Sequence, residues 1–234
     1  MFKIIYALLF QLVNISISAL KWPIAALMVF LLPPMFEALK HFNLMNEKFM
    51  AFAVGFAAYI VIKFMSSAQV NNSLLTLAHE MTHIVFAWLT LHKVTHIHLN
   101  MDDTGGAMAF KGRGNWLIAI APYFFPLVVF VIMLGMTFFS KKIPDSLAVN
   151  GMLGYFFAYH VEGIKVQVHP EQTDFKVVGF PFCFLFLPGA NLFMFSAIMA
   201  FNNGGWLGIQ KYVYVVSKLT ERLYAGYWEQ ITNL

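Results

Sequence analysis

Long apolar runs follow one another along most of the chain, separated by short polar segments. A membrane-spanning helix needs about 20 predominantly apolar residues. Seven runs approach this length: Phe2–Leu20, Trp22–Leu39, Phe49–Ser66, Leu74–Leu91, Trp116–Phe139, Leu147–Ile164 and Val177–Phe201. The pattern predicts an all-α polytopic membrane protein with six or seven transmembrane helices. It divides the chain into N-terminal transmembrane helices over 1–70, a core over 71–201 and a C-terminal helix over 202–234.

The hydrophobic period changes directly after the fourth run. Val94, His96, His98 and Asn100 alternate with Thr95, Ile97 and Leu99, which is typical of a β-strand. The segment 102–106 reads Asp-Asp-Thr-Gly-Gly and predicts a turn, so that residues 107–111 can pair back. We therefore expect a small membrane-associated β-hairpin, whose free edge could accept an extended peptide by strand addition.

The stretch from Trp206 to Tyr227 combines apolar residues at helical spacing with scattered charges. The apolar positions are Ile209, Val213, Val216, Leu219 and Leu223, and the charged ones are Lys211, Lys218, Glu221 and Arg222. This combination favours an amphipathic helix lying at the membrane interface. A last spanning helix is the alternative, which the charges make less favourable.

Composition agrees with the apolar pattern. The chain is 60% hydrophobic and 11% charged, with a mean hydropathy of +0.70, values that exclude an ordinary soluble domain. The net charge of +4 is scattered along the sequence, so nothing supports nucleic-acid binding, and the expected partner is the lipid bilayer. Basic residues divide almost evenly between the two sides of a seven-helix arrangement, so their distribution does not predict which side of the protein faces the cytosol.

The fourth apolar run contains the sequence His79-Glu80-Met81-Thr82-His83, an HExxH motif. Residues four apart on a helix lie one turn above each other, so both imidazoles can bind one Zn²⁺ ion. Glu80 can then take a proton from a water molecule that zinc activates. The motif predicts hydrolysis inside a bilayer; the alternative is a buried polar cluster without a metal.

A catalytic zinc ion typically has a third protein ligand, and several residues could supply it. Asp174 leads, because it stands just before an apolar run whose first turn could carry a carboxylate inward. His160, Glu162 and Glu171 are alternatives, as are His96 and His98, which we expect to be solvated or to face a substrate; His169 is expected at the surface.

The position of Asp174 raises a problem of distance. A seven-helix arrangement places Asp174 near the end of the HExxH helix at Leu91, which lies about 12 Å along the helix from His83. Either the final helix begins before Val177, or a water-filled pocket connects the zinc site to that face.

Several segments together resemble the site-2-protease class of intramembrane zinc metalloproteases, particularly its small bacterial branch. They are LAHEMTH, the hairpin KVTHIHLNMDDTGGAMAF, the helix start NWLIAIAPYFFPL and a Thr-Asp pair before a final apolar stretch, spanning Leu74 to Phe201, about half the chain. The resemblance implies that residues 71–201 are a metalloprotease core. One departure is that Pro188-Gly189-Ala190-Asn191-Leu192 does not reproduce the Leu-Asp-Gly segment that delivers the aspartate ligand in many members.

The resemblance also implies roles for individual residues. His79, His83 and Asp174 would bind zinc, and Glu80 would be the catalytic acid and base. The substrate would be a membrane-embedded or juxtamembrane segment of another protein, docked against the hairpin edge, and the location would be the bacterial cytoplasmic (inner) membrane. Two other functions stay open: a non-proteolytic zinc transporter or sensor, and a membrane metalloprotease with a glutamate as third ligand.

Overall fold

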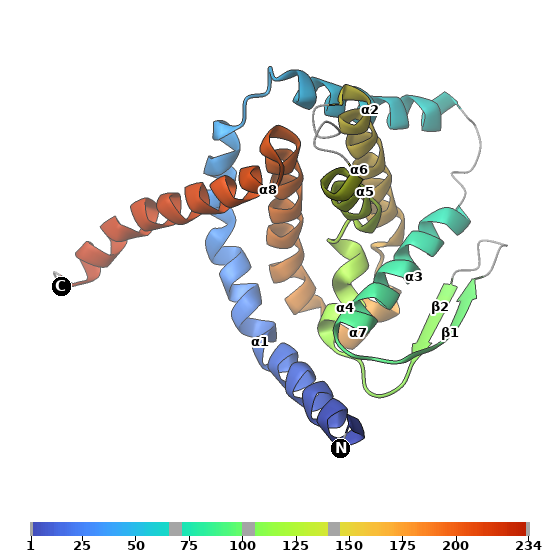
Figure 1. The fold of residues 1–234 in the computed structure, drawn as a ribbon. Coiled ribbons are helices and arrows are strands. Elements are labelled where there is room, and N and C mark those ends of the chain that lie inside the picture. The colour runs from blue at the N-terminus through green and yellow to red at the C-terminus, as the bar shows by residue number, and fades with distance from the viewer. Residues whose placement is uncertain (1, 66–71, 100–105, 140–145, 233–234) are drawn as a thin grey trace.

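The computed structural model describes residues 2–65, 72–99, 106–139 and 146–232 (Figure 1). Helices dominate, and the described residues form one sheet, of two strands. The elements are α1 (Phe2–Ala38), η1 (Leu39–His41), α2 (Glu47–Met65), α3 (Asn72–Leu89), β1 (Val94–Leu99), β2 (Gly106–Phe110), α4 (Trp116–Ile120), η2 (Ala121–Tyr123), α5 (Leu127–Phe139), α6 (Leu147–Gln167), α7 (Thr173–Val178) and α8 (Phe180–Thr232).

The first two predicted spans are one continuous helix, α1, so the prediction of two helices here was wrong. Lys21, which separates the two apolar runs, does not end the helix; its Nζ donates a hydrogen bond to the carbonyl oxygen of Val178, at 2.7 Å. Ile4, Leu8, Leu12 and Ile15 are each at least 60% exposed and recur at helical spacing. They form an apolar stripe that suits contact with lipid.

Six or seven spans are not confirmed. Within the described residues, three helical segments are long and apolar enough to cross a membrane: 3–41, 47–65 and 180–225. A fourth results if the segments 116–123 and 127–138, which meet at an angle of 84°, count as one broken span. α3 carries the HExxH motif and is apolar from Leu74 to Leu89, which is shorter than a typical span.

Close helix packing through glycine joins α2 to α6. A Cβ atom at Gly154 would overlap the carbonyl oxygen of Phe52, and one at Gly55 would overlap the carbonyl oxygen of Gly151. The absence of side chains therefore lets the two backbones approach each other directly, as small residues do between membrane helices. Figure 1 shows α2 lying across the top of the molecule, above α6.

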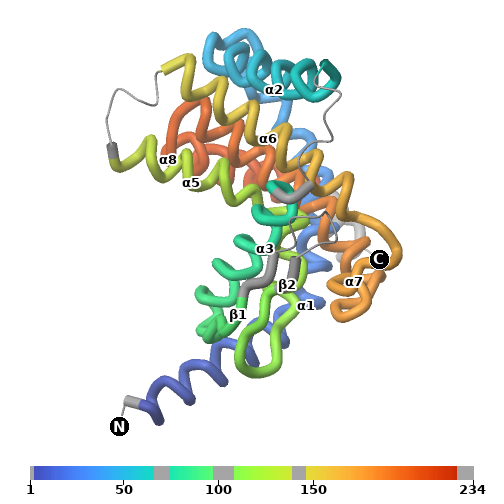
Figure 2. Tube along the Cα trace, turned by 90° about the vertical axis from the view of Figure 1, so that its right-hand side faces the viewer, coloured from blue at the N-terminus to red at the C-terminus, as the bar shows by residue number. Residues whose placement is uncertain are grey.

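The predicted hairpin is present as the antiparallel pair β1 and β2, with Val94 opposite Phe110 and Leu99 opposite Gly106. The register shifts between Val94 and His96. Residues 102–105 of the predicted turn lie outside the described residues, and Gly106, which the prediction included in the turn, is the first residue of β2. Figure 2 shows both strands beside α3, on the far side of the molecule from α2. The hairpin therefore lies next to the helix that carries the HExxH motif.

Two glycines separate the C-terminal helix from the rest of α8. Gly204 and Gly205 leave the helical conformation, and Gly205 has φ +61°, a value that glycine adopts without strain. The predicted helix after Trp206 is thus confirmed as a distinct segment, which extends away from the helical bundle in Figure 1. It packs on α1, where the rings of Tyr224 and Phe30 stack with centroids 4.0 Å apart. Its location at a membrane interface stays a prediction.

A buried apolar core holds α7 in place. Phe175 and Val178 of this short helix are each 4% exposed and belong to the same cluster as Trp116, Tyr123 and Phe182. These residues come from α4, η2 and α8, and the cluster packs against the middle of α1. The first turn of α7 is therefore presented at a fixed place beside α3.

Candidate metal centre

α3 brings the two motif histidines together. His79 and His83 are 7% and 8% exposed, and their Nε2 atoms lie 2.9 Å apart. This is the arrangement that the four-residue spacing predicts for one face of a helix. The two imidazoles can therefore offer nitrogen atoms to one shared position.

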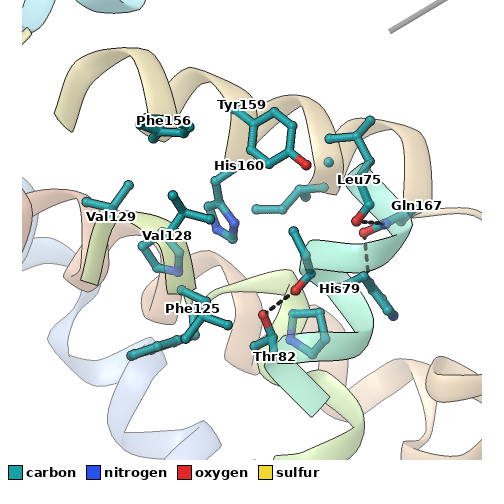
Figure 3. Close-up of a pocket in the computed structure, with 16 residues that line it drawn as sticks. Leu75, His79, Thr82, Phe125, Val128, Val129, Phe156, Tyr159, His160 and Gln167 are labelled. Atoms are coloured by element: carbon teal, nitrogen blue, oxygen red, sulfur yellow. Dashed lines mark hydrogen bonds between the residues drawn. The ribbon is translucent and has the colours of Figure 1, made fainter. Parts of the chain in front are cut away.

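Oxygen atoms from other elements fix the orientation of both imidazole rings. His79 Nδ1 lies 2.8 Å from Oε1 of Gln167, and His83 Nδ1 lies 2.8 Å from the carbonyl oxygen of Ile118. Gln167 in turn donates from Nε2 to the carbonyl oxygen of Leu75, at 3.3 Å, which sets the orientation of its amide (Figure 3). Because both partners of the histidines are acceptors, each Nδ1 carries a proton and donates. Each neutral ring then presents the lone pair of Nε2 to the shared position.

Asp174, in the first turn of α7, lies next to these nitrogen atoms. Its Oδ2 atom lies 3.5 Å from Nε2 of His79 and 3.5 Å from Nε2 of His83. The hydroxyl of Tyr123 donates a hydrogen bond to the same oxygen, at 2.9 Å. The hydrogen bond from Tyr123 favours the ionised form of the Asp174 carboxyl group, which burial by itself would oppose.

Glu80 borders the same group of atoms. It is 7% exposed, and one of its carboxylate oxygens lies within 4.8 Å of the ligand nitrogens of His79 and His83. The imidazole pair therefore has two carboxylates beside it. One comes from the motif helix itself and the other from α7, which lies far away in the sequence.

This donor set fits a zinc ion. Two imidazole nitrogens and one carboxylate oxygen are typical ligands of catalytic zinc, and ligand atoms around a tetrahedral ion lie about 3.3 Å apart. The observed separations of 2.9, 3.5 and 3.5 Å agree with that value. Three electron-rich atoms pointing at one another would repel without a positive charge between them. His79, His83 and Asp174 could therefore hold the metal, with Glu80 next to it.

The other predicted third ligands lie elsewhere. Glu162 forms an ion pair with Lys63, and Glu171 is exposed and lies 3.0 Å from Lys176. The remaining candidates are histidines: His96 and His169 are exposed, and the side chain of His98 lies outside the described residues. Sequence reasoning ranked Asp174 first among these candidates, and only Asp174 of them contacts the His79–His83 pair in the described part of the chain.

His160 lines a small cavity that His79 also borders, but no contact joins it to His79, His83 or Asp174 within the described residues. The cavity has a volume of about 30 Å³ and is bordered by α3, α5 and α6, with His79 and Gln167 on one side (Figure 3). The Nε2 atom of His160 is buried and has no hydrogen-bond partner among the described residues. A cavity of this size has room for about one water molecule, which could satisfy that nitrogen.

A larger cleft opens on the other side of the motif. Its volume is about 430 Å³, and its walls come from α3, β2, the segment between β2 and α4, and α7. Met108 and Phe110 of β2 line it together with His79, Glu80 and Asp174. The sequence raised the problem that Asp174 would lie far along the helix from the level of His83. Asp174 reaches the histidines because it lies on α7, a separate short helix that begins at Thr173 beside the cleft.

Two residues of the site were not predicted from the sequence. Gln167 stands at the end of a long apolar helix, and Tyr123 lies within the quoted segment NWLIAIAPYFFPL. A glutamine ending an apolar run and a tyrosine between Pro122 and Phe124 are unremarkable by pattern. Their contacts with His79 and Asp174 depend on how α6 and η2 pack against α3 and α7.

Comparison with known proteins gives a family match for the part of the chain that contains the HExxH motif. Residues 50–161 match the family model described as Peptidase M50B-like, consistent with a site-2-protease-like family. The match confirms the resemblance predicted from the sequence and supports a membrane metallopeptidase of the site-2-protease kind. No curated protein and no solved structure matches the chain.

Proposed function

We propose that this chain is an intramembrane zinc endopeptidase that cleaves a membrane-embedded or juxtamembrane segment of another protein. One observation carries the proposal. Two imidazole nitrogens and the Asp174 carboxylate converge beside Glu80, at the wall of a cleft of about 430 Å³. By the resemblance, its place would be the bacterial cytoplasmic membrane.

His79, His83 and Asp174 would hold the metal, and the surrounding chain keeps them in position. Gln167 and the Ile118 carbonyl fix the two rings, and Tyr123 fixes the carboxylate. Zinc bound there would supply Lewis acidity, which activates water and polarises the peptide carbonyl. Catalysis then needs a base beside that water.

In this proposal Glu80 moves the protons. Its carboxylate takes a proton from the attacking water and passes it to the amine nitrogen that leaves when the peptide bond breaks. The proton is conserved over the cycle, so Glu80 returns to its ionised form. Glu80 lies next to His79 in the cleft lining and is largely buried, so its carboxylate stays close to the metal ligands.

The substrate must be extended at the bond that is cut. In a helix, the scissile carbonyl is hydrogen-bonded within the backbone and covered by side chains. Met108 and Phe110 place β2 at the cleft wall, and a strand edge can bind an extended peptide through backbone hydrogen bonds. The hairpin therefore offers a way to unwind a membrane segment beside Glu80.

The first test is Glu80→Gln, with Glu171→Gln as the matched control. Zinc content and cleavage of a membrane-protein substrate are measured for both variants in detergent micelles. We expect Glu80→Gln to keep its zinc and lose cleavage by at least 100-fold, while the exposed Glu171→Gln keeps both. Undiminished cleavage by Glu80→Gln would refute the proposed role. Zinc transport in proteoliposomes without any cleavage would instead favour the transporter or sensor function.

A further inference from the structure

The cleft has a cation at its edge that the proposed reaction does not use. Apart from the histidines, Arg113 is the only basic residue among the described residues that line it. The remaining lining combines apolar and uncharged polar groups: Met108, Phe110, Gly114, Asn115, Ile118, Ala119, Gln172, Thr173 and Val177. Because Arg113 is exposed, water solvates its guanidinium group, and an anionic group of a bound molecule could take the place of that water.

The backbone of Arg113 is firmly anchored. Its carbonyl oxygen accepts a hydrogen bond from Nε2 of His92, at 3.1 Å. His92 is 2% exposed, lies 2.9 Å from the Thr90 hydroxyl, and contacts the rings of Phe10 and Phe110 with centroids 4.9 and 5.0 Å away. The loop that carries Arg113 is thus fixed to the end of α3.

The turn before Arg113 is equally defined. Gly112 has φ +94°, a conformation that favours glycine. One residue earlier, the amide of Lys111 donates to the carbonyl oxygen of Lys93, at 2.9 Å. A rigid loop that presents a long charged side chain at a cleft is the usual arrangement of a recognition group.

The guanidinium group itself is available. Arg113 is exposed, and within the described part of the chain no acidic side chain forms an ion pair with it. The two carboxylates of the cleft, Glu80 and Asp174, lie against the imidazoles. Arg113 therefore keeps its donors for a molecule that enters the cleft.

The apolar residues of β2 that line the cleft lie close to Arg113 along the chain. Met108 and Phe110 both line the cleft, and Arg113 follows Phe110 by three residues, which can span at most about 10 Å. A peptide lying along β2 would thus pack apolar side chains on Met108 and Phe110 and bring a group a few residues away to the guanidinium. Guanidinium groups bind carboxylates through paired, charge-assisted hydrogen bonds.

Resting on the proposed peptidase function, we propose that Arg113 is a specificity-determining residue that binds a carboxylate of the substrate, a few residues from the bond that is cut. The substrate class is a membrane protein with an apolar segment followed closely by an acidic group. The carboxylate could come from an Asp or Glu side chain or from the C-terminus of the substrate.

The test uses matched peptide substrates in micelles. One series moves a single Asp through the polar positions that flank an apolar segment, with Asn as the neutral partner at each position. A second pair differs only in a free or amidated C-terminus. For each peptide, kcat/KM is measured with the unaltered protein, with Arg113→Gln and with Arg113→Glu. Lys111→Gln is the control. Lys111 is exposed, basic and two residues from Arg113, but it does not line the cleft.

We expect one Asp position to raise kcat/KM about tenfold over Asn, the size of a partly exposed charge-assisted contact. Arg113→Gln removes this preference and Arg113→Glu inverts it, so that the Asn peptide is cleaved better than the Asp peptide, while Lys111→Gln retains it. A preference confined to the free C-terminus assigns the carboxylate to the chain end. A preference that survives Arg113→Gln, or no preference at any position, overturns the proposal.

A binding measurement separates this inference from the peptidase function. Fluorescence anisotropy reports the affinity of the labelled Asp and Asn peptides whether or not they are cut. If no peptide is cleaved, the proposed function fails; tighter binding of the Asp peptide that depends on Arg113 still supports the subsite, and equal binding refutes it. Zinc content checks that each Arg113 variant keeps an intact site.

Discussion

Gln167 accepts a hydrogen bond from Nδ1 of His79, at 2.8 Å, and so links the last residue of α6 to the first histidine of the motif. The contact sets which nitrogen of His79 faces the shared position. Partners of this kind raise metal affinity by roughly 10- to 100-fold in other proteins. The geometry of the candidate metal centre therefore depends on the packing of α6 against α3 as well as on α3 itself.

Replacement of Gln167 by Leu should weaken zinc binding by about tenfold or more, because His79 loses the acceptor that orients it. Competition with a chelator of known affinity measures the effect. Gln167→Glu keeps an acceptor and should retain most of the affinity. Gln210→Leu, at an exposed position of α8, is the control. Equal zinc affinity in Gln167→Leu and Gln210→Leu would exclude an orienting role for Gln167.

Tyr123→Phe removes the hydroxyl that donates to Asp174 Oδ2. The ring and its packing remain, so the unfolding transition should change little. We expect zinc affinity to fall about tenfold or more, the worth of one hydrogen bond to a charged group. Tyr214→Phe serves as control, because Tyr214 is 62% exposed. A Tyr123→Phe protein with unaltered affinity would show that Asp174 does not need this donor.

Lys21→Met should loosen α7. The Lys21 ammonium group donates to the carbonyl oxygen of Val178 and lies 5.1 Å from the centre of the Phe182 ring, so it holds the C-terminal end of the helix that carries Asp174. We expect faster hydrogen exchange in residues 173–179 and zinc affinity lowered several-fold. Lys40→Met, which removes an exposed ion pair with Glu37, should change neither. Unchanged exchange in Lys21→Met would contradict the role of this contact.

Gly154→Ala should separate α2 from α6. The added methyl group would overlap the carbonyl oxygen of Phe52, and overpacking of this kind destabilises by about 1 to 3 kcal/mol. Thermal unfolding in detergent measures the loss. Gly163→Ala in the same helix is the matched control, since its Cβ would meet Leu75 at an ordinary 3.7 Å and alanine favours a helix. Equal stability of the two variants would show that close contact between the helices is dispensable.

The sequence by itself determined the features that depend on neighbouring residues. The four-residue spacing of His79 and His83 places both rings on one face of a helix whatever surrounds it. Alternation from Val94 to Asn100 likewise indicated the first strand, because a period of two is typical of strands. The turn after it indicated that a second strand pairs back. The apolar composition indicated a membrane protein, since a soluble fold of this length could not cover so much apolar surface.

Only the tertiary structure decided which distant groups meet these local elements. Asp174 was one of several candidate ligands by sequence, and the apolar core beneath α7 brings its carboxylate to His79 and His83. The packing of α6 brings in Gln167, and α1 continues through Lys21, whose ammonium group contacts the carbonyl oxygen of Val178 instead of separating two helices. Such contacts arise from the packing of whole helices, which no local period along the chain encodes.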